Sequence, residues 1–132
     1  MILGLGTDIV AVHRIERVIK SNPRFIEKVF SLGEQQYCSG KANPAQSYAA
    51  RFAAKEAFMK ALGTGWDEGI SWVQIEVVND AKGKPCLKLS GATEALAKSR
   101  GTELIHLSLS HEKDYAIATV ILEKRDALCP AK

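Results

Sequence analysis

The feature that most constrains the fold of this chain is one long alanine-rich segment with a marked beginning and end. It starts with Asn43, a good N-cap, followed by Pro44 at the first helical position and by Gln46 where a capping box needs a partner. Gly63 is placed to end the helix in a left-handed conformation. Alanines between these ends raise the helix propensity, among them Ala49, Ala50, Ala53, Ala54, Ala57 and Ala61. The sequence therefore predicts a single long helix between Asn43 and Gly63.

The segments on either side of this helix predict a mixture of strands and helices. Ile2–Val10 is mostly apolar, with Asp8 as its only charge and interruptions at Gly4 and Gly6, and it is interpreted as a buried strand. Val12–Phe30 repeats apolar residues at helical spacing, and Pro23 is expected to break or kink it into two helices. Beyond the long helix we expect a hairpin, a helix and two strands, the last of them central: Trp72–Val78 with Cys86–Leu89, Ala92–Arg100, Leu104–Ser110 and Tyr115–Leu122. This order predicts an α+β fold, an antiparallel sheet with helices packed on one side.

Length and composition point to one globular domain. The chain has 132 residues, of which 46% are hydrophobic and 25% charged, and this excludes a disordered or collagen-like chain. We assign residues 1–123 to a single domain and expect residues 124–132 to form a flexible tail. No apolar run approaches the ~20 residues of a membrane span, and the N-terminus lacks the basic cluster of a signal peptide.

Cysteine usage and charge indicate the compartment and the kind of partner. Cys38, Cys86 and Cys129 are odd in number and show no C-x-x-C spacing, which favours reduced thiols and a cytoplasmic location over disulfides or a zinc site. The net charge is +3, and residues 1–60 carry nine Lys and Arg against five Asp and Glu. This basic excess is compatible with an acidic or phosphorylated partner, but it is too small to indicate nucleic-acid binding.

Three charged residues are candidates for chemistry because they stand among apolar ones. Asp8 is costly to bury unless it is paired or binds a cation, although composition alone slightly favours an Asp that caps a turn at a strand end. Glu56 and Lys60 are four residues apart, so they lie on one helix face together with Phe52. An ordinary surface ion pair would explain the spacing, but the partly apolar face favours a functional pair. Carboxylates are hard ligands that suit Mg²⁺ better than zinc.

Two glycine pairs and a Ser-His sequence are weaker signals. Gly4-Leu5-Gly6 and Gly63-Thr64-Gly65 are interpreted as tight turns whose N–H groups can also meet a phosphate, since neither completes a nucleotide-binding motif. Ser110 and His111 point to opposite faces of a strand, which argues against a serine nucleophile and leaves His111 as a phosphate contact or a turn cap. Together these residues fit metal-assisted phosphate chemistry without defining the reaction.

Two motifs resemble the paired signature of the 4'-phosphopantetheinyl transferases. The first is Gly6-Thr7-Asp8-Ile9, and the second is Arg51-Phe52-x-x-Lys55-Glu56-x-x-x-Lys60. The opening GLGTDIV, the alanine-rich helix, the LGTG that follows it and the SLSH near the end are similar to the short bacterial type, the holo-[acyl-carrier-protein] synthases. The resemblance extends from Met1 to Glu123.

The resemblance implies an activity and its partners. Members of this family are Mg²⁺-dependent enzymes that transfer the 4'-phosphopantetheine arm of coenzyme A to a serine of apo acyl carrier protein. They release adenosine 3',5'-bisphosphate and activate the carrier protein for fatty acid biosynthesis. The short members are homotrimers with active sites between neighbouring subunits. Neither nucleic acid nor a membrane is an expected partner.

The resemblance also implies a role for each matching residue. Asp8 and Glu56 would hold Mg²⁺, and Lys60 would complete the catalytic group. Coenzyme A would be bound by Arg51, Lys60, Gly63, Thr64, Gly65 and His111. The acceptor of the serine proton stays open between Glu56, a water held by the metal, and a deprotonated Lys60.

The basic helical region near the N-terminus is expected to dock the carrier protein, which is acidic in this family. The candidate residues are Arg14, Arg17, Val18, Arg24 and Phe25. The three arginines can share one helical face provided that Pro23 only kinks the helix. An ordinary solvated basic face is the alternative explanation.

Two other classes of function are weighed against the transferase. A Mg²⁺-dependent nuclease or nucleic-acid binder would use the same carboxylates, but the sequence lacks interleaved basic and aromatic residues. A trimeric adaptor that catalyses nothing would use the basic region, but it leaves Asp8, Glu56 and Lys60 unexplained. Mass spectrometry of apo carrier protein incubated with the chain, coenzyme A and Mg²⁺ separates the three.

Overall fold

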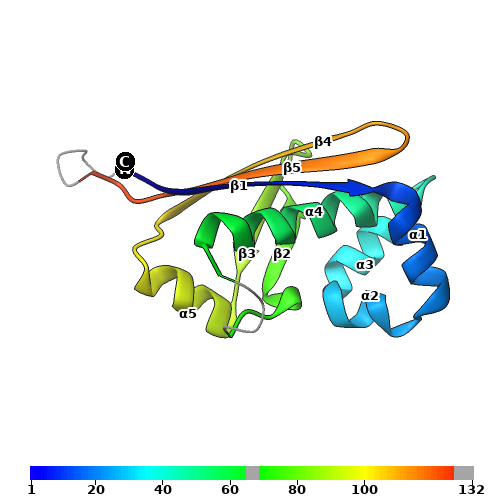
Figure 1. Cartoon of the computed structure of the whole chain (residues 1–132), viewed down its shortest axis with the longest axis horizontal. Helices are drawn as coiled ribbons and strands as arrows, with labels where there is room; N and C mark the ends of the chain where they lie inside the picture. The colour runs from blue at the N-terminus through cyan, green and yellow to red at the C-terminus, as the bar shows by residue number, and fades with distance from the viewer. Residues whose placement is uncertain (65–68, 127–132) are drawn as a thin grey trace.

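A three-stranded antiparallel sheet runs along one side of the molecule (Figure 1). The structure is a computed structural model, and it describes residues 1–64 and 69–126. The strands are β1 (Ile2–Ala11), β5 (Tyr115–Glu123) and β4 (Leu104–His111), in the order β1-β5-β4. The prediction that Tyr115–Leu122 forms a central strand is therefore confirmed.

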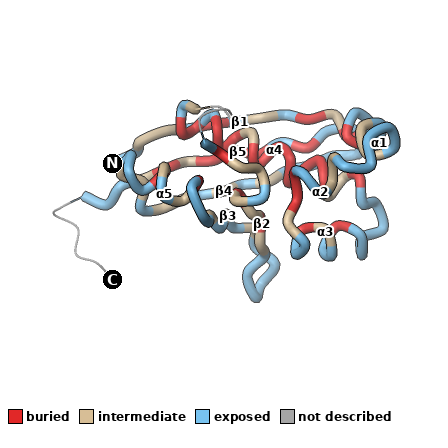
Figure 2. The backbone as a smooth tube through the Cα atoms, turned by 90° about the horizontal axis from the view of Figure 1, so that it is seen from below, coloured by how far each residue is buried: buried red, intermediate tan, exposed pale blue. Residues whose placement is uncertain are grey.

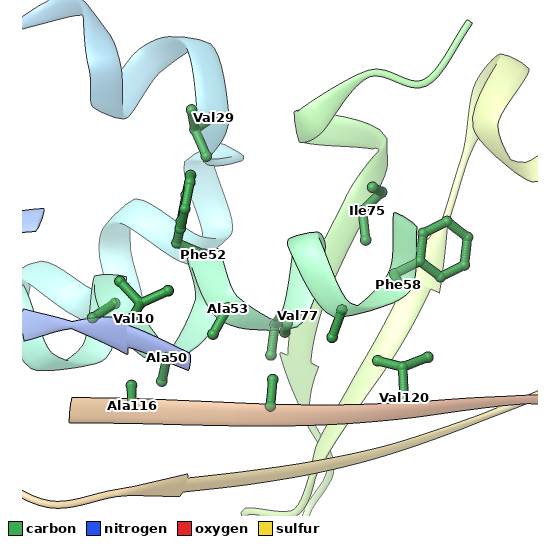
Figure 3. Packing of buried hydrophobic residues seen from close by; sticks show 14 of the residues in the cluster. Val10, Val29, Ala50, Phe52, Ala53, Phe58, Ile75, Val77, Ala116 and Val120 are labelled. Atoms are coloured by element: carbon green, nitrogen blue, oxygen red, sulfur yellow. The ribbon is translucent and has the colours of Figure 1, made fainter. Parts of the chain in front are cut away.

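The long helix α4 (Pro44–Leu62) packs against one face of this sheet and contacts both β1 and β5. Its sheet-facing alanines meet small residues of β5, Ala116 and Ala118, all of them buried. Small side chains on both surfaces let helix and sheet approach closely. The core then continues on the other side of α4 with larger residues, including Phe52, Phe58 and Ile75 (Figure 3).

The ends of α4 agree with the sequence in all but one detail. The Asn43 side chain accepts a hydrogen bond from the backbone of Gln46, and Gly63 ends the helix with φ 76°. The Gln46 side chain, however, does not complete a capping box, because it donates to the carbonyl of Glu112 instead. The capping box of the fold lies at the start of α3, where Ser31 and Glu34 bond each other's backbone N–H.

Three short helices gather at one end of α4: α1 (Val12–Ser21), α2 (Arg24–Val29) and α3 (Leu32–Ser39). Pro23 breaks the predicted helical stretch completely, because Asn22 before it is extended, with φ −136° and ψ 91°. Phe30 packs against Tyr48 of α4 with the two rings tilted by 57° and 4.7 Å between their centroids.

A second, two-stranded sheet lies beside the middle of α4, whereas the sequence alone indicated a single sheet. Its strands are β2 (Ile75–Asn79) and β3 (Pro85–Leu89), followed by α5 (Gly91–Ser99). The alternation of Val73, Ile75 and Val77 predicts a strand from Trp72, but Trp72–Gln74 forms the 3-10 helix η2. Val73 is consequently exposed, while Ile75 and Val77 are buried.

The prediction of β1 as a buried strand is wrong, because β1 is an edge strand with only one covered face. Val10 and Gly6 face α4 and are buried, but Leu5 and Ile9 are more than half exposed. Figure 2 shows how buried and exposed positions alternate along the strand. The open face of the sheet also carries apolar residues, among them Leu5, Ile9, Tyr115 and Ile117. A strand that is apolar on both faces has the same sequence pattern whether both faces are buried or only one, so the pattern wrongly predicted burial on both.

Met1 holds the start of β1 against the segment that directly follows β5. The Met1 ammonium donates to the Lys124 carbonyl at 2.6 Å and forms an ion pair with Asp126 at 3.2 Å. The rest of the predicted tail, residues 127–132, lies outside the described residues. Within the described ranges, no helix is both long and apolar enough to cross a membrane.

Candidate active site

Asp8 and Lys60 meet where β1 crosses α4. The Lys60 ammonium donates to the Asp8 Oδ1 atom and to the Thr7 carbonyl, both at 3.0 Å, although 52 positions separate Lys60 from Asp8. The Asp8 side chain is only 16% exposed, while that of Lys60 is 54% exposed. The carboxylate is therefore held in place, and the ammonium reaches it from the solvent side.

Two glycines make this close crossing possible. A Cβ atom at Gly6 would overlap the carbonyl oxygen of Ala57, and one at Gly4 would overlap that of Ala61. Both glycines lie within β1, so their interpretation as a tight turn is wrong. Their actual role is to let the strand lie directly on the helix backbone. The sequence holds no separate signal for this role, because it depends on a partner more than 50 residues away.

Glu56 lies one helical turn before Lys60 and faces the same place. Burial raises the pKa of the half-buried Glu56 carboxyl, and the negative charge of Asp8 raises it further. Lys60 and, more weakly, Arg14 oppose this rise in pKa by stabilising the charged form. Two carboxylates from different elements thus converge with one ammonium between β1 and α4.

This donor set fits a hard divalent cation only if other ligands join it. Within residues 1–64 and 69–126, no group of three or more His, Cys, Asp or Glu is arranged to hold a metal ion. Two carboxylates are nevertheless the donors that Mg²⁺ takes from proteins when waters and substrate phosphates complete its shell. The negative charges of Asp8 and Glu56 repel each other, and a bound cation would relieve that repulsion.

Arg51 and His111 line a separate cavity of about 220 Å³, with residues of α3, α4 and the β2–β3 hairpin. Arg51 is buried, and its Nη2 donates to the Asn79 side chain at 2.9 Å. Its guanidinium lies 4.0 Å from the centre of the Tyr37 ring, and its Nε finds no hydrogen-bond partner within the described chain. A buried cation with an unused donor beside a cavity is suited to an anion. Sequence reasoning did not identify Tyr37 or Asn79, since only the fold brings them to Arg51.

The predicted coenzyme A residues therefore fall into two groups within one chain. Arg51 and Lys60 are nine residues apart, about two and a half turns, so they project from opposite sides of α4. Gly63 and Thr64 follow Lys60 at the end of α4, while Gly65 lies outside the described residues. Gly63 has open space around its Cα, and Thr64 is half-buried.

The predicted docking residues lie on two helices rather than on one. Arg14, Arg17 and Val18 line an open hollow of about 550 Å³ on α1, together with Lys20 and Ser21. Because Pro23 breaks the helix, Arg24 does not continue the helical face of α1, which corrects the expectation of a single arginine face. Phe25 is half-buried, and its ring packs against Phe30 and Phe52 at centroid distances of 5.9 Å.

The arrangement of a carboxylate on the first strand and a carboxylate and lysine on the long helix agrees with one protein family. The sequence model of the 4'-phosphopantetheinyl transferase superfamily matches residues 4–120. The chain belongs to this superfamily. Within the superfamily it is a member of the holo-[acyl-carrier-protein] synthases.

Relatives and solved structures of the superfamily resemble the chain over almost its whole length. The holo-[acyl-carrier-protein] synthase of Geobacter metallireducens is 49% identical over 125 residues, covering 94% of this chain and 99% of that protein. The crystal structure of the synthase from Neisseria meningitidis is 38% identical, with a TM-score of 0.87, and covers 94% of this chain and all of that one (100%). The synthase from Bacillus anthracis, solved in complex with CoA (3',5'-ADP), is 38% identical with a TM-score of 0.79, covering 95% and 99%.

Proposed function

We propose that this chain transfers the 4'-phosphopantetheine group of coenzyme A to a serine of apo acyl carrier protein, releasing adenosine 3',5'-bisphosphate. The observation that carries the proposal is the convergence of Asp8, Glu56 and Lys60 from β1 and α4 in a member of this superfamily. The holo-[acyl-carrier-protein] synthases to which the chain is similar are named for this carrier protein, and one of them was solved with coenzyme A.

Asp8 and Glu56 are proposed to hold Mg²⁺ against the pyrophosphate of coenzyme A. When bound, the cation supplies Lewis-acid polarisation and neutralises charge on the transferred and leaving phosphates. The chain's own part is to keep the two carboxylates close, half-shielded from water and fixed by the strand–helix crossing. Lys60, one turn from Glu56, exchanges its bond to Asp8 for one to a phosphate oxygen.

The proton acceptor for the attacking serine stays open between Glu56, a water held by the cation, and Lys60. Lys60 already donates to the Asp8 carboxylate and to the Thr7 carbonyl. Burial and Asp8 raise the pKa of the Glu56 carboxyl in the metal-free site, and a cation held there would oppose that rise.

The split of the coenzyme A residues around α4 supports a homotrimer whose active sites lie between subunits. Lys60 and Arg51 project from opposite sides of α4. One coenzyme A molecule therefore cannot easily bind the site at Asp8, Glu56 and Lys60 and the cavity at Arg51 and His111 of the same chain. Pairing the Lys60 side of one copy with the Arg51 side of another would form one continuous site. The open apolar face of the sheet offers surface for such contacts. Light scattering tests this directly, and a mass of 14.4 kDa, that of the monomer, contradicts it.

The remaining features of the proposal follow the same family. The acidic carrier protein docks beside the active site on Arg14, Arg17, Val18, Arg24 and Phe25. The positive charge of Arg14 is close enough to Glu56 to oppose the rise in the pKa of its carboxyl. The reaction takes place in the cytoplasm and activates the carrier protein for fatty acid biosynthesis. Neither nucleic acid nor a membrane takes part.

Mass spectrometry of the carrier protein tests the reaction. Apo acyl carrier protein incubated with the chain, coenzyme A and Mg²⁺ should gain one phosphopantetheine group. Asp8→Ala should lower the rate by at least ~10³-fold, because the cation loses one of its two protein ligands. Glu112→Ala removes an exposed carboxylate from the β4–β5 turn and serves as the matched control. An unmodified carrier protein, or full activity of Asp8→Ala in saturating Mg²⁺, would refute the proposal.

A further inference from the structure

The second motif contains one charged residue that the proposed reaction does not use. Lys55 precedes Glu56 on α4, yet its side chain is completely buried, with 0% of it exposed. Its ammonium donates to the Glu34 Oε1 atom at 2.8 Å, to the Trp72 carbonyl at 2.9 Å and to the Ile75 carbonyl at 2.6 Å. Three acceptors require three N–H groups, which only the charged amine has.

Glu34, the partner of Lys55, is equally buried and equally saturated. Its Oε1 accepts from the Ser31 backbone as part of the capping box, and its Oε2 accepts from the Val77 backbone at 3.0 Å. The Ser31 hydroxyl in turn donates to the Glu76 carboxylate at 2.5 Å. The network therefore ties the middle of α4 to the start of α3, to η2 and to β2.

A network of this kind is not explained by stability alone. Burying two opposite charges costs several kcal/mol per ion in desolvation, and apolar residues of similar volume often stabilise a fold as well or better. Burial does lower the pKa of Lys55, and the Glu34 carboxylate opposes that change. What the network supplies, and apolar residues do not, is a set of directional bonds that allow α4 only one rotation about its axis.

That rotation determines where Glu56 points. On the opposite side of α4, β1 packs against the helix backbone through Gly4 and Gly6, and this close packing fixes the distance of Asp8 from the helix. Side-chain ends lie about 5–6 Å from a helix axis, so a rotation of ~10° moves the Glu56 carboxylate by about 1 Å. A misplacement of ~1 Å in a catalytic group can cost about 10²-fold in rate.

We propose that the buried Lys55–Glu34 pair positions Glu56 opposite Asp8, so that Lys55 is a positioning residue for the cation site. The inference rests on the proposed function for its meaning, but it concerns the geometry of the two carboxylates. It predicts that neutralising the pair without unfolding the chain changes cation binding. Arg51 is held by its own hydrogen bond to the Asn79 side chain at 2.9 Å, so contacts of coenzyme A with Arg51 should change much less.

The test is the double variant Glu34→Gln/Lys55→Met, which removes both charges while the introduced amide oxygen keeps one of the two backbone N–H donors that Glu34 binds, that of Ser31 or that of Val77. We expect a folded protein whose Kd for Mn²⁺, measured by electron paramagnetic resonance without coenzyme A, rises about tenfold. The half-saturating Mg²⁺ concentration for transfer should rise by a similar factor, while the KM for coenzyme A at saturating Mg²⁺ stays within about twofold. Glu94→Gln/Lys98→Met removes the exposed ion pair of α5 and is the matched control.

Two outcomes overturn the inference. One is a folded double variant with unchanged Mn²⁺ and Mg²⁺ affinities, since a purely structural pair would alter only the melting temperature. The other applies if the double variant does not fold. Glu34→Asp, which keeps the charge but shortens the side chain, is then measured instead. Unchanged affinities for Mn²⁺ and Mg²⁺ in that folded variant overturn the inference. If the parent binds Mn²⁺ but transfers nothing, the proposed function fails, and the Mn²⁺ measurement still decides the positioning role.

Discussion

Two lysine–carboxylate pairs stand five residues apart on α4, and they differ in almost everything except chemistry. Lys60 and Asp8 lie 3.0 Å apart with the lysine 54% exposed, while Lys55 and Glu34 lie 2.8 Å apart with both side chains at 0%. Lys60 has one carboxylate and one carbonyl partner, whereas Lys55 fills all three of its hydrogen bonds inside the fold. The ammonium of the exposed pair can leave for a substrate phosphate, and that of the buried pair cannot leave without unfolding the region.

The contrast teaches that charge and spacing do not separate a reactive residue from a structural one. Both lysines belong to one short motif, and both carboxylate partners come from distant segments. Burial decides the difference, because an exposed pair exchanges partners at little cost while a buried one loses several kcal/mol when one partner goes. The following predictions break or sharpen this comparison, in order of decreasing effect.

The sharpest test replaces each lysine in turn by methionine. Lys55→Met should lower the free energy of unfolding by about 3–5 kcal/mol, because Glu34 is left as an uncompensated buried charge. Lys60→Met should change it by less than about 1 kcal/mol but lower kcat by at least ~10²-fold, since the exposed lysine acts on the substrate. Urea unfolding and transfer kinetics on both variants provide the measurements. Equal losses of stability would show that the two pairs do not differ in kind.

Gly6→Ala tests the crossing that places Asp8 beside Lys60. The added methyl group overlaps the Ala57 carbonyl, so β1 must move away from α4, at a cost of about 1–3 kcal/mol. We also expect a higher Mg²⁺ requirement, because Asp8 moves with the strand. Gly40→Ala is the control, because its added Cβ would make only ordinary contacts. Normal Mg²⁺ dependence of a folded Gly6→Ala protein would disconnect the glycines from the site.

Arg14 of α1 and Arg24 of α2 are exposed like Lys60, so they are also expected to act on a binding partner. Reversing the charge of Arg14 and Arg24 together should raise the KM for acyl carrier protein about tenfold at low salt, and the increase should shrink as salt screens exposed charges. The KM for coenzyme A should change much less. Charge reversal at Lys82 and Lys84, which lie in the exposed β2–β3 turn, is the control for net charge. An unaltered carrier-protein KM would leave these arginines as an ordinary solvated face.

The smallest expected effect concerns the pH dependence of stability. The pKa of Glu56 is raised in the folded protein by burial and by Asp8, so its ionised form opposes folding. Glu56→Gln should therefore raise the melting temperature of the metal-free protein at pH 7 by roughly 1–4 °C. The gain should fade as the pH falls through the raised pKa of Glu56 toward its unfolded value, where the parent carboxyl is already neutral. Calorimetry between pH 3 and 7 measures it, and a gain that grows on acidification contradicts the sign.

Much of the framework could be predicted from local signals. Asn43 and Gly63 mark the ends of α4 because capping depends on neighbouring residues only, and Pro23 breaks the first helical stretch for the same local reason. The largely apolar character of β5 on both faces indicates a central strand. Asp8, Glu56 and Lys60 were identified because charges among apolar residues are conspicuous. Their meeting was implied only by the resemblance to a family.

The errors share one physical cause, which is that the deciding partner lies far away in the sequence. Gln46 has the right spacing for a capping box, but the Glu112 carbonyl takes its side chain. Trp72–Gln74 alternates like a strand, yet the carbonyl of Trp72 serves the buried Lys55 ammonium from a 3-10 turn. The edge position of β1 follows from strand order, which no local pattern contains.

The sequence by itself determined the long capped helix, the broken helix before it, the strand-rich second half and the charged residues able to perform phosphate chemistry. Only the tertiary structure decided which of two lysines in one motif is buried and which is free to meet a substrate. It also decided that Gly4 and Gly6 are the surface on which β1 rests against α4. Helix caps and propensities act over a few residues, whereas burial and close approach depend on neighbours that folding alone brings together.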